Sequence, residues 1–441
     1  MVDRALAAAR QAGADAADAL VIVSASTTAG VRLGELEEAS RSESRDLGLR
    51  VLVGARSAQV ATSDLSEAAI AEAAGRAVAM ARLAPEDPYA GLAETGQLAH
   101  GPFPCLDLFD EAVLAITPQQ LRAMAQAAEA AALGVAGVSN SEGGSATAGH
   151  SRMALGTSTG FRGTQEGTSV SVSAVAIAGE GAARQRDYDW SQARFLSDLR
   201  DPEGIGRSAG ERASARRNPV RLATGAMPVV FDWRVSASLL GHLAGAMSGP
   251  AIARGTSFLK GRQGERLFRP GVRVVDDPHR RRGLRSRAFD GEGLPTARTL
   301  LVDDGMLGGW LLDSASARQL GLRATGHASR GLGGPPTVAT SNLHLEAGTM
   351  SVESLIADIR LGFLVTELIG MGVNGLTGDY SRGAAGFAIR DGAIAEPVTE
   401  MTIAGNLLDM FRELVPADDL VFRLATNSPT VRVDGMTVAG A

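Results

Sequence analysis

One segment near the C-terminus carries the most structural information in this chain, and it reads Thr377-Gly378-Asp379-Tyr380-Ser381-Arg382-Gly383-Ala384-Ala385-Gly386-Phe387. Its glycines allow the backbone to turn sharply or to approach another segment closely. Its charged, aromatic and hydroxyl side chains exceed what a connecting turn requires. The run continues into Asp391-Gly392 between apolar residues, a pattern that predicts a β-hairpin with these two residues at its tip.

The polar part of this segment is a candidate functional site. Arg and Tyr are enriched among the anchor residues of protein interfaces. Ser381 has charged neighbours but no histidine or lysine beside it, and a serine nucleophile requires such a base within hydrogen-bond reach. We therefore expect Asp379, Tyr380, Ser381 and Arg382 to form a turn that lines a cleft or a subunit interface, with Tyr380 outside the core.

Working outward, the chain predicts an α+β fold of two parts. The first is an N-terminal mixed α/β region, residues 1–220, with a possible further boundary near residue 100. The second is a larger C-terminal β-rich domain with packed helices, residues 221–441. The alternating run 169–177 predicts antiparallel strands with one wet face. The cluster Asp187-Tyr188-Asp189-Trp190 is interpreted as an ordinary strand end with an aromatic lid, and the alternative is a substrate-facing edge.

Local signals place several elements. Thr117 and Pro118 are typical of a helix start, Gly134 of a helix end, and Ser63-Asp64 of a helix cap. We expect helices over residues 3–12, 66–82, 117–133, 314–320, 352–361 and 406–415, a helix containing Ala209 and Ala213, and strands over residues 19–23, 46–54 and 57–62.

Composition excludes some classes of protein. Of 441 residues, 45% are hydrophobic and 21% are charged, and the net charge is -6, so nothing favours nucleic acid as a partner. The basic cluster 279–287 is interpreted as a solvated loop. Cys105 is the only cysteine, which excludes an internal disulfide. The chain starts without a signal-peptide pattern and has no long apolar run, so we expect a cytoplasmic protein that does not cross a membrane.

Three segments resemble a known family. They are residues 238–243 (Ser-Leu-Leu-Gly-His-Leu), the acidic turn 289–293 and the segment 377–387. They resemble the TldD/TldE family of bacterial peptidase subunits, and its TldE (PmbA) branch in particular. The resemblance implies an α+β subunit that forms a heterodimer with a TldD-type subunit. It also implies that the two enclose a peptide cleft and that their substrates are short or unfolded peptides.

The resemblance also implies what this chain lacks. In the TldD branch a His-Glu-x-x-x-His helix and a cysteine near the C-terminus hold the catalytic metal. Here the matching helix carries only His242, no His-Glu pair occurs in the sequence, and the tail 427–435 contains no cysteine. A hydrolytic metal site usually needs three protein ligands and a general base. The resemblance therefore implies no metal, no cofactor and no catalytic residue in this chain, with zinc in the TldD-type partner.

The remaining candidates have ordinary structural interpretations beside the functional ones. His327, in a polar turn, is the best candidate among the histidines for the peptide cleft or interface, and a structural hydrogen-bonding role is favoured over a catalytic one. His242 is expected to be a buried, satisfied side chain, and His344 to face solvent or a partner. A metal site assembled from these three histidines stays open. Residues 156–160 match the letters of a Gly-x-Ser-x-Gly nucleophile elbow, but no helix pattern follows, so a turn between strands is expected.

Two other function classes stay open. One is a self-sufficient metallopeptidase with an unrecognised site. The other is a homodimeric peptide-binding or scaffold protein without protease activity. Metal content of the purified chain separates the first from the TldE-like interpretation, and co-purification with a TldD homologue separates the second.

Overall fold

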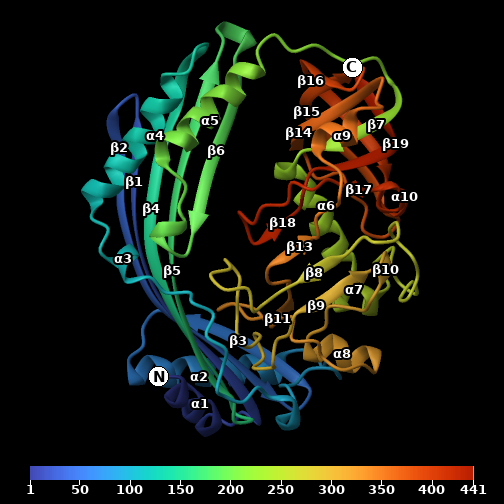
Figure 1. Ribbon diagram of the computed structural model, residues 1–441. Helices are drawn as coiled ribbons and strands as arrows, with labels where there is room; N and C mark the ends of the chain where they lie inside the picture. The colour runs from blue at the N-terminus through green and yellow to red at the C-terminus, as the bar shows by residue number, and fades with distance from the viewer. Residues whose placement is uncertain (441) are drawn as a thin grey trace.

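An antiparallel sheet dominates the first half of the protein in the computed structural model, which describes residues 1–440 (Figure 1). Its strands are β1 (Ala16–Arg32), β2 (Glu35–Val53), β3 (Arg56–Thr62), β4 (Val138–Thr157), β5 (Arg162–Ala178) and β6 (Gln185–Ala193). Within the described residues, the strand order is β3-β2-β1-β4-β5-β6 and every neighbouring pair is antiparallel. Along β5 the residues from Val170 onward alternate between buried and half-exposed, which confirms the predicted strands with one wet face.

Strands β1 and β2 are much longer than the apolar runs that predicted them. The expected strands covered residues 19–23 and 46–54, whereas β1 has 17 residues and β2 has 19. The first nine residues of β2 are exposed, so a hydrophobic pattern cannot reveal them. Backbone pairing to β1 extends the strand there, with one register shift between Gly30 and Val31.

Two pairs of helices cover the sheet at opposite ends (Figure 1). The first pair is α1 (Val2–Gln11) and α2 (Glu67–Leu83), and the second is α4 (Pro118–Leu133) and α5 (Pro202–Ala215). Helix α4 begins as predicted, because the Thr117 hydroxyl accepts the Gln120 amide hydrogen and the Gln120 side chain accepts the Thr117 amide hydrogen. The cap of α2 is Ser66 rather than residues 63–64. Helices α4 and α5 approach so closely that a Cβ at Gly206 would lie 1.8 Å from the Ala128 carbonyl oxygen.

A second large sheet organises the C-terminal half. Its strands are β7 (Gly225–Phe231), β14 (Leu361–Ile369), β15 (Asp379–Arg390), β16 (Ala393–Asn406), β17 (Val415–Pro416) and β19 (Val431–Gly440). In the described chain they follow the order β16-β15-β14-β7-β19-β17, and β16 also pairs with β19, so the sheet closes on itself. The predicted hairpin is confirmed: Arg390 pairs with Ala393 across Asp391 and Gly392, whose φ angles are 48° and 78°.

The polar segment before the hairpin differs from its prediction. Residues 379–382 are not a turn, because they form the first part of strand β15 and pair with β16 from Asn406 to Ile403. Alternate side chains of a strand point to opposite faces, so the four candidate residues divide into two pairs. The physical reason for the error is that Gly378 and the acidic Asp379, which are typical of turns, stand at the junction between the loop and the strand.

The remaining elements are smaller. One further sheet, in the order β10-β9-β8-β13-β18, contains β8 (Val274–Asp276), β9 (Thr299–Asp303), β10 (Met306–Leu307), β13 (Leu343–Leu345) and β18 (Thr426–Asn427). The other elements are the strand pair β11 (Ala328–Ser329) and β12 (Thr337–Val338) and the helices α3 (Glu111–Leu114), α6 (Trp233–Ala246), α7 (Gly249–Arg254), α8 (Ser314–Leu320), α9 (Val352–Ile356) and α10 (Leu407–Glu413). Helix α8 matches its predicted bounds, and α9 ends earlier than predicted because Leu361 already belongs to β14.

Asp187 shows how the two halves are joined. It lies within β6, is 2% exposed, and accepts hydrogen bonds from Arg234 of α6 at 2.7 Å and from Arg216 at 3.3 Å. The expectation of an ordinary strand end is therefore wrong for this residue. A buried charge without a partner is costly, so the arginines and the carboxylate depend on one another across the junction.

The α+β prediction is confirmed, with a β-rich C-terminal half that carries packed helices. The boundaries near residues 100 and 220 stay predictions. In the part of the chain that the structure describes, no helix has the length and apolar character needed to span a membrane.

Candidate functional site

Helix α6 is the element that the family resemblance associates with metal binding. It begins at the Asp232 cap, whose carboxylate accepts the Arg234 amide hydrogen at 2.9 Å, and it buries Leu239, Leu240 and other residues of one face. His242 is half-buried on this helix. Its Nε2 atom is shielded from solvent and has no hydrogen-bond partner among the described residues. The expectation of a satisfied buried histidine is therefore wrong.

Tyr380 packs against His242 from strand β15. The two rings meet edge to face with centroids 5.9 Å apart, and Tyr380 is 1% exposed within the C-terminal core. Burial raises the pKa of Tyr380 to about 12, and the nearby Arg382 guanidinium only partly opposes that rise. The prediction that Tyr380 lies outside the core is wrong. The prediction treated the segment as a turn, whereas alternate side chains of a strand point to opposite faces, so Tyr380 points inward while Asp379 and Ser381 stay exposed.

Arg382 lies on the same face of β15 as Tyr380. It pairs with Ile403 of β16 in the strand register and is half-buried. Its Nε atom and the Tyr380 hydroxyl both lack a hydrogen-bond partner within residues 1–440. Burial and, secondarily, the Arg382 charge lower the pKa of His242, so the imidazole stays neutral around physiological pH. His242, Tyr380 and Arg382 thus form one polar cluster with unsatisfied atoms.

Asp379 and Ser381 point away from this cluster. Both are exposed, and the Asp379 carboxylate accepts hydrogen bonds from the Thr377 hydroxyl at 2.6 Å and the Asn406 amide at 3.2 Å. These two hydrogen bonds hold the pKa of Asp379 below its usual value. The Ser381 amide donates to the Gly372 carbonyl at 2.7 Å, which folds the preceding loop back onto the strand. The structure therefore separates the four predicted site residues into an inner and an outer pair.

His327 is 3% exposed and stands apart from this segment in the hydrogen-bond network. Its Nε2 lies 3.3 Å from Asp276 Oδ2, and its Nδ1 lies 2.8 Å from the Thr325 hydroxyl. These contacts give the ring the structural hydrogen-bonding role that the sequence favoured over a catalytic one, and its place in a peptide cleft stays a prediction. The sequence did not reveal Asp276 as its partner, because the two residues are far apart in the chain. His344 is 9% exposed, so the expectation that it faces solvent is wrong.

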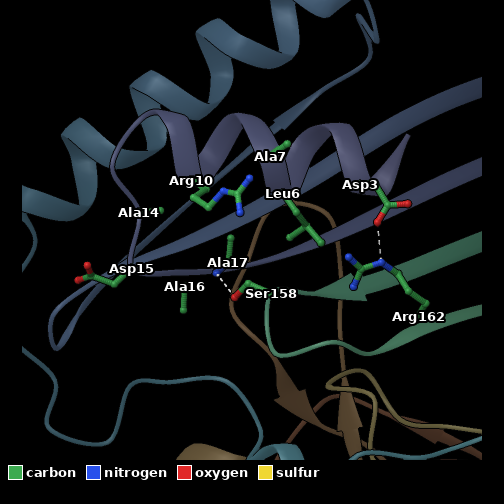
Figure 2. Close-up of a pocket in the computed structure, with 10 residues that line it drawn as sticks. All are labelled: Asp3, Leu6, Ala7, Arg10, Ala14, Asp15, Ala16, Ala17, Ser158 and Arg162. Atoms are coloured by element: carbon green, nitrogen blue, oxygen red, sulfur yellow. Dashed lines mark hydrogen bonds and ion pairs between the residues drawn. The ribbon is translucent and has the colours of Figure 1, made fainter.

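The Gly-x-Ser-x-Gly letters belong to a turn between β4 and β5, as predicted. Figure 2 shows Ser158 at the edge of a surface cavity of about 270 Å³ beside helix α1. The Ser158 hydroxyl accepts the Ala17 amide hydrogen at 3.0 Å, and Arg162 pairs with Asp3 across the same cavity. None of the ten residues that line it is a histidine or a lysine, so Ser158 has no base there to activate it.

The residues that the structure describes do not fit a catalytic zinc. Within residues 1–440 no group of three or more His, Cys, Asp or Glu side chains is placed to hold a metal ion. His242 is the one imidazole on α6, and its closest charged neighbour in the cluster is the cation Arg382. A guanidinium repels a divalent cation where a metal site would need a carboxylate or a second imidazole.

Comparisons with known proteins identify relatives along almost the whole chain. Three family domains match: PmbA/TldA metallopeptidase domain 1 over residues 17–81, the central domain over residues 111–217 and the C-terminal domain over residues 224–440. The Escherichia coli O157:H7 protein named Metalloprotease PmbA is 36% identical over 97% of this chain and 92% of its own length. A Haemophilus influenzae protein named Metalloprotease PmbA homolog is 33% identical over 98% of this chain and 94% of its own length.

Solved structures give the same result for the fold. A Bacteroides thetaiotaomicron crystal structure, described as a proposed modulator of DNA gyrase, superposes with a TM-score of 0.92 at 27% identity. It covers 100% of this chain and 98% of its own. The crystal structure of TldE from Thermococcus kodakarensis covers 99% of both chains with a TM-score of 0.87 at 23% identity. The fold and the order of its matched domains thus define a metallopeptidase-like protein. More specifically, this chain belongs to the PmbA/TldD family.

Proposed function

We propose that this chain is a TldE-type subunit that lacks a catalytic metal and pairs with a metal-bearing TldD-type homologue in the cytoplasm. The heterodimer cleaves short or unfolded peptides, and the zinc and the catalytic groups belong to the partner. The observation that carries this proposal is the environment of α6, where His242 has Arg382 rather than an acidic side chain or a second histidine as its polar neighbour.

Electrostatics supports the proposal that α6 holds no catalytic metal. A zinc site binds neutral imidazoles, thiolates and carboxylates and concentrates positive charge at the metal. Arg382 already supplies a positive charge close enough to lower the pKa of His242. The unsatisfied atoms of His242, Tyr380 and Arg382 are instead suited to receive polar groups from another chain or from a peptide.

The outer side of β15 supports a contact with another subunit. Large apolar side chains are exposed at the end of β14 and in the loop that connects it to β15: Ile369 is 58% exposed, Met371 88% and Leu376 58%. This loop folds onto the first residues of β15 through the Ser381 amide. Apolar side chains clustered beside exposed Asp379 and Ser381 are typical of a protein interface. We therefore propose that the loop and the outer pair of site residues contact the TldD-type partner.

Relatives of both types occur in one organism. Haemophilus influenzae has the PmbA homolog described above and a protein named Metalloprotease TldD homolog, which is 26% identical over 53% of this chain. The two relatives from one source support a pair of related but different subunits rather than one self-sufficient chain.

The central test compares the purified chain alone with the chain mixed with a TldD homologue. We expect no stoichiometric zinc by elemental analysis of the chain alone and no cleavage of a fluorogenic peptide, followed by chelator-sensitive cleavage in the mixture. A tightly held metal in the chain alone, lost on substitution of His242, would show a self-sufficient metallopeptidase. A stable homodimer that binds peptides and ignores the TldD homologue would show a scaffold protein.

A matched pair of variants tests the proposed interface. Met371→Asp places a charge in the exposed loop, and we expect it to weaken association with the TldD homologue by about tenfold or more because it buries a carboxylate in the contact. Met80→Asp on α2 is the control, since Met80 is 47% exposed on a distant face. Equal affinities of both variants and the unmodified chain, measured by biolayer interferometry, would place the partner elsewhere.

A further inference from the structure

A cavity of about 470 Å³ lies between the N-terminal sheet and the C-terminal half. Leu20 and Arg194 line it from the N-terminal half, and Arg287, Phe289 and Arg330 line it from the other. Its volume lies in the range of small-molecule and peptide pockets. It belongs neither to the His242 cluster nor to the exposed loop of the proposed partner contact.

Positive charge dominates the wall of this cavity. Four arginines line it, namely Arg194, Arg285, Arg287 and Arg330, against one acidic residue, Asp290. Arg330 is paired, because its Nε donates to Asp18 Oδ1 at 2.8 Å, and Arg50 shares the same carboxylate. The other three arginines form no ion pair with any residue in the described part of the chain. The charges of Asp276 and Asp290 act on Arg287 from a greater distance, whereas burial alone shifts the pKa of Arg194.

Backbone carbonyls hold two of these arginines in place without neutralising them. Arg194 donates to the Thr168 carbonyl at 3.0 Å and to the Leu284 carbonyl. Arg287 donates to the Ala339 carbonyl at 2.9 Å. A carbonyl satisfies an N–H group but leaves the net charge intact, and an uncompensated charge at low dielectric is unfavourable. Burial accordingly lowers the pKa of both guanidinium groups.

The one acidic residue on the wall already accepts hydrogen bonds from the backbone. Asp290 Oδ1 accepts the amide hydrogens of Glu292 and Leu294, and Oδ2 accepts that of Ala328. Burial raises the pKa of Asp290, and its backbone hydrogen bonds and the charge of Arg287 only partly oppose that rise. The site therefore offers fixed guanidinium groups to an anion that enters from solvent.

A second cavity of about 320 Å³ continues the basic surface and shares Arg194 and Leu284 with the first. It is lined by Arg280 and Arg423, whose guanidinium groups stack over Phe422 at 3.4 Å and Trp233 at 4.0 Å. The basic cluster 279–287 thus lies along the junction of the two halves. Its interpretation as a solvated loop is wrong for residues such as Ser286, which is 1% exposed.

Apolar side chains face the same space as the arginines. Leu20, Met153, Leu155 and Phe289 all line the first cavity. A wall of this kind accepts an aliphatic or aromatic group next to the anion. Guanidinium groups bind planar carboxylates with two parallel hydrogen bonds. The free C-terminus of a peptide with an apolar last residue combines both features.

We propose that this cavity binds the C-terminal carboxylate of a short peptide whose last residue is apolar, and that the preceding residues extend toward the second cavity. The peptide part of this inference rests on the proposed peptide-processing function. The anion-binding part rests on the three unpaired arginines alone. Binding in this place would hold a peptide by its end at the junction of the two halves.

Arg285 provides the cleanest test, because its side chain is exposed and makes no hydrogen bond or ion pair with any described residue. The probe is a fluorescein-labelled pentapeptide that ends in leucine, either as the free acid or as the amide, and binding to the full chain is followed by fluorescence anisotropy. We expect the free acid to bind about tenfold more tightly or better, as for hydrogen bonds to a charged group. Arg285→Gln should weaken the free acid severalfold and Arg285→Glu by about tenfold or more.

Arg10→Gln is the matched control, since Arg10 is an exposed arginine on α1 that lines a different cavity. It should leave the affinity unchanged, and thermal unfolding should show that all variants are folded. Equal binding of acid and amide, or an unchanged affinity in Arg285→Glu, would overturn the inference. So would inorganic phosphate or a short oligonucleotide that displaces the free-acid peptide at lower concentration than an unlabelled copy does. Peptide cleavage by the mixture with a TldD homologue is measured separately. Loss of carboxylate binding would therefore not contradict the proposed function, and absence of cleavage would not contradict the anion-binding site.

Discussion

Glu292 should make the stability of this protein fall as pH rises through neutrality. Its side chain is 4% exposed in the turn at the junction of the two halves, and its Oε2 accepts the Ser314 amide hydrogen at 2.7 Å. Burial, helped by the nearby charge of Asp290, raises the pKa of Glu292 from 4.5 to about 7. Each pKa unit corresponds to about 1.4 kcal/mol, so the raised pKa costs about 3 kcal/mol once the carboxylate ionises.

The sign follows from proton binding. Between the unfolded pKa of 4.5 and the folded pKa of about 7, the folded protein holds a proton that the unfolded chain has lost. The free energy of unfolding therefore declines as pH rises across this window and levels off above it. Glu292→Gln removes the titration and keeps an oxygen that can accept the Ser314 hydrogen. We expect the variant to lack this decline and to gain up to about 3 kcal/mol over the unmodified protein at about pH 8.

The measurement is urea unfolding, followed by tryptophan fluorescence, at a series of pH values from about 4.5 to about 8. Glu72→Gln is the control, because Glu72 is exposed on α2 and its loss should leave the pH profile unchanged. If the unmodified protein and Glu292→Gln give parallel profiles across this range, the carboxylate ionises freely in the folded state. The argument from burial would then be refuted.

Three further substitutions test other parts of the structure. Asp187→Ala should lower the free energy of unfolding by about 3–5 kcal/mol, because it removes the buried carboxylate that pairs with both Arg234 and Arg216, and calorimetry checks this. Burial raises the pKa of Asp187, but the hydrogen bond and charge of Arg234, the Tyr188 amide and the Arg216 charge together outweigh it and hold that pKa low. This contribution should therefore vanish in acid as pH falls below the ordinary aspartate range. Tyr380→Phe should change the free energy of unfolding by no more than about 1 kcal/mol, since the hydroxyl has no partner in residues 1–440. Tyr380→Ala removes the buried ring and should lower the free energy of unfolding by about 3–5 kcal/mol, and chemical denaturation measures both variants. Arg382→Gln should raise the pKa of His242, measured by NMR titration of the imidazole, and an unchanged titration would show that burial alone lowers it.

Much of the candidate site depended on distances that local patterns do not contain. Tyr380 was placed at a surface because its neighbours are glycines and charged residues, yet the alternation of β15 buries it against His242. The atoms that make this cluster unusual, such as Arg382 Nε, are defined by missing partners in three dimensions. The arginines that line the cavity between the two halves come from separate segments, and only the fold brings three guanidinium groups without an ion pair to one place.

By itself, the sequence was sufficient for the elements whose signals are local. The Thr117 cap with Pro118, the Asp391-Gly392 hairpin tip and the alternation along β5 each depend on a few neighbouring residues, and each is confirmed. The family could also be identified from the sequence, because its motifs are short and contiguous. Tertiary structure alone decided the length of β2, whose exposed residues are held by backbone pairing to β1. It also decided which charges are paired, because Coulomb energy depends on distance and burial, and neither is set by position along the chain.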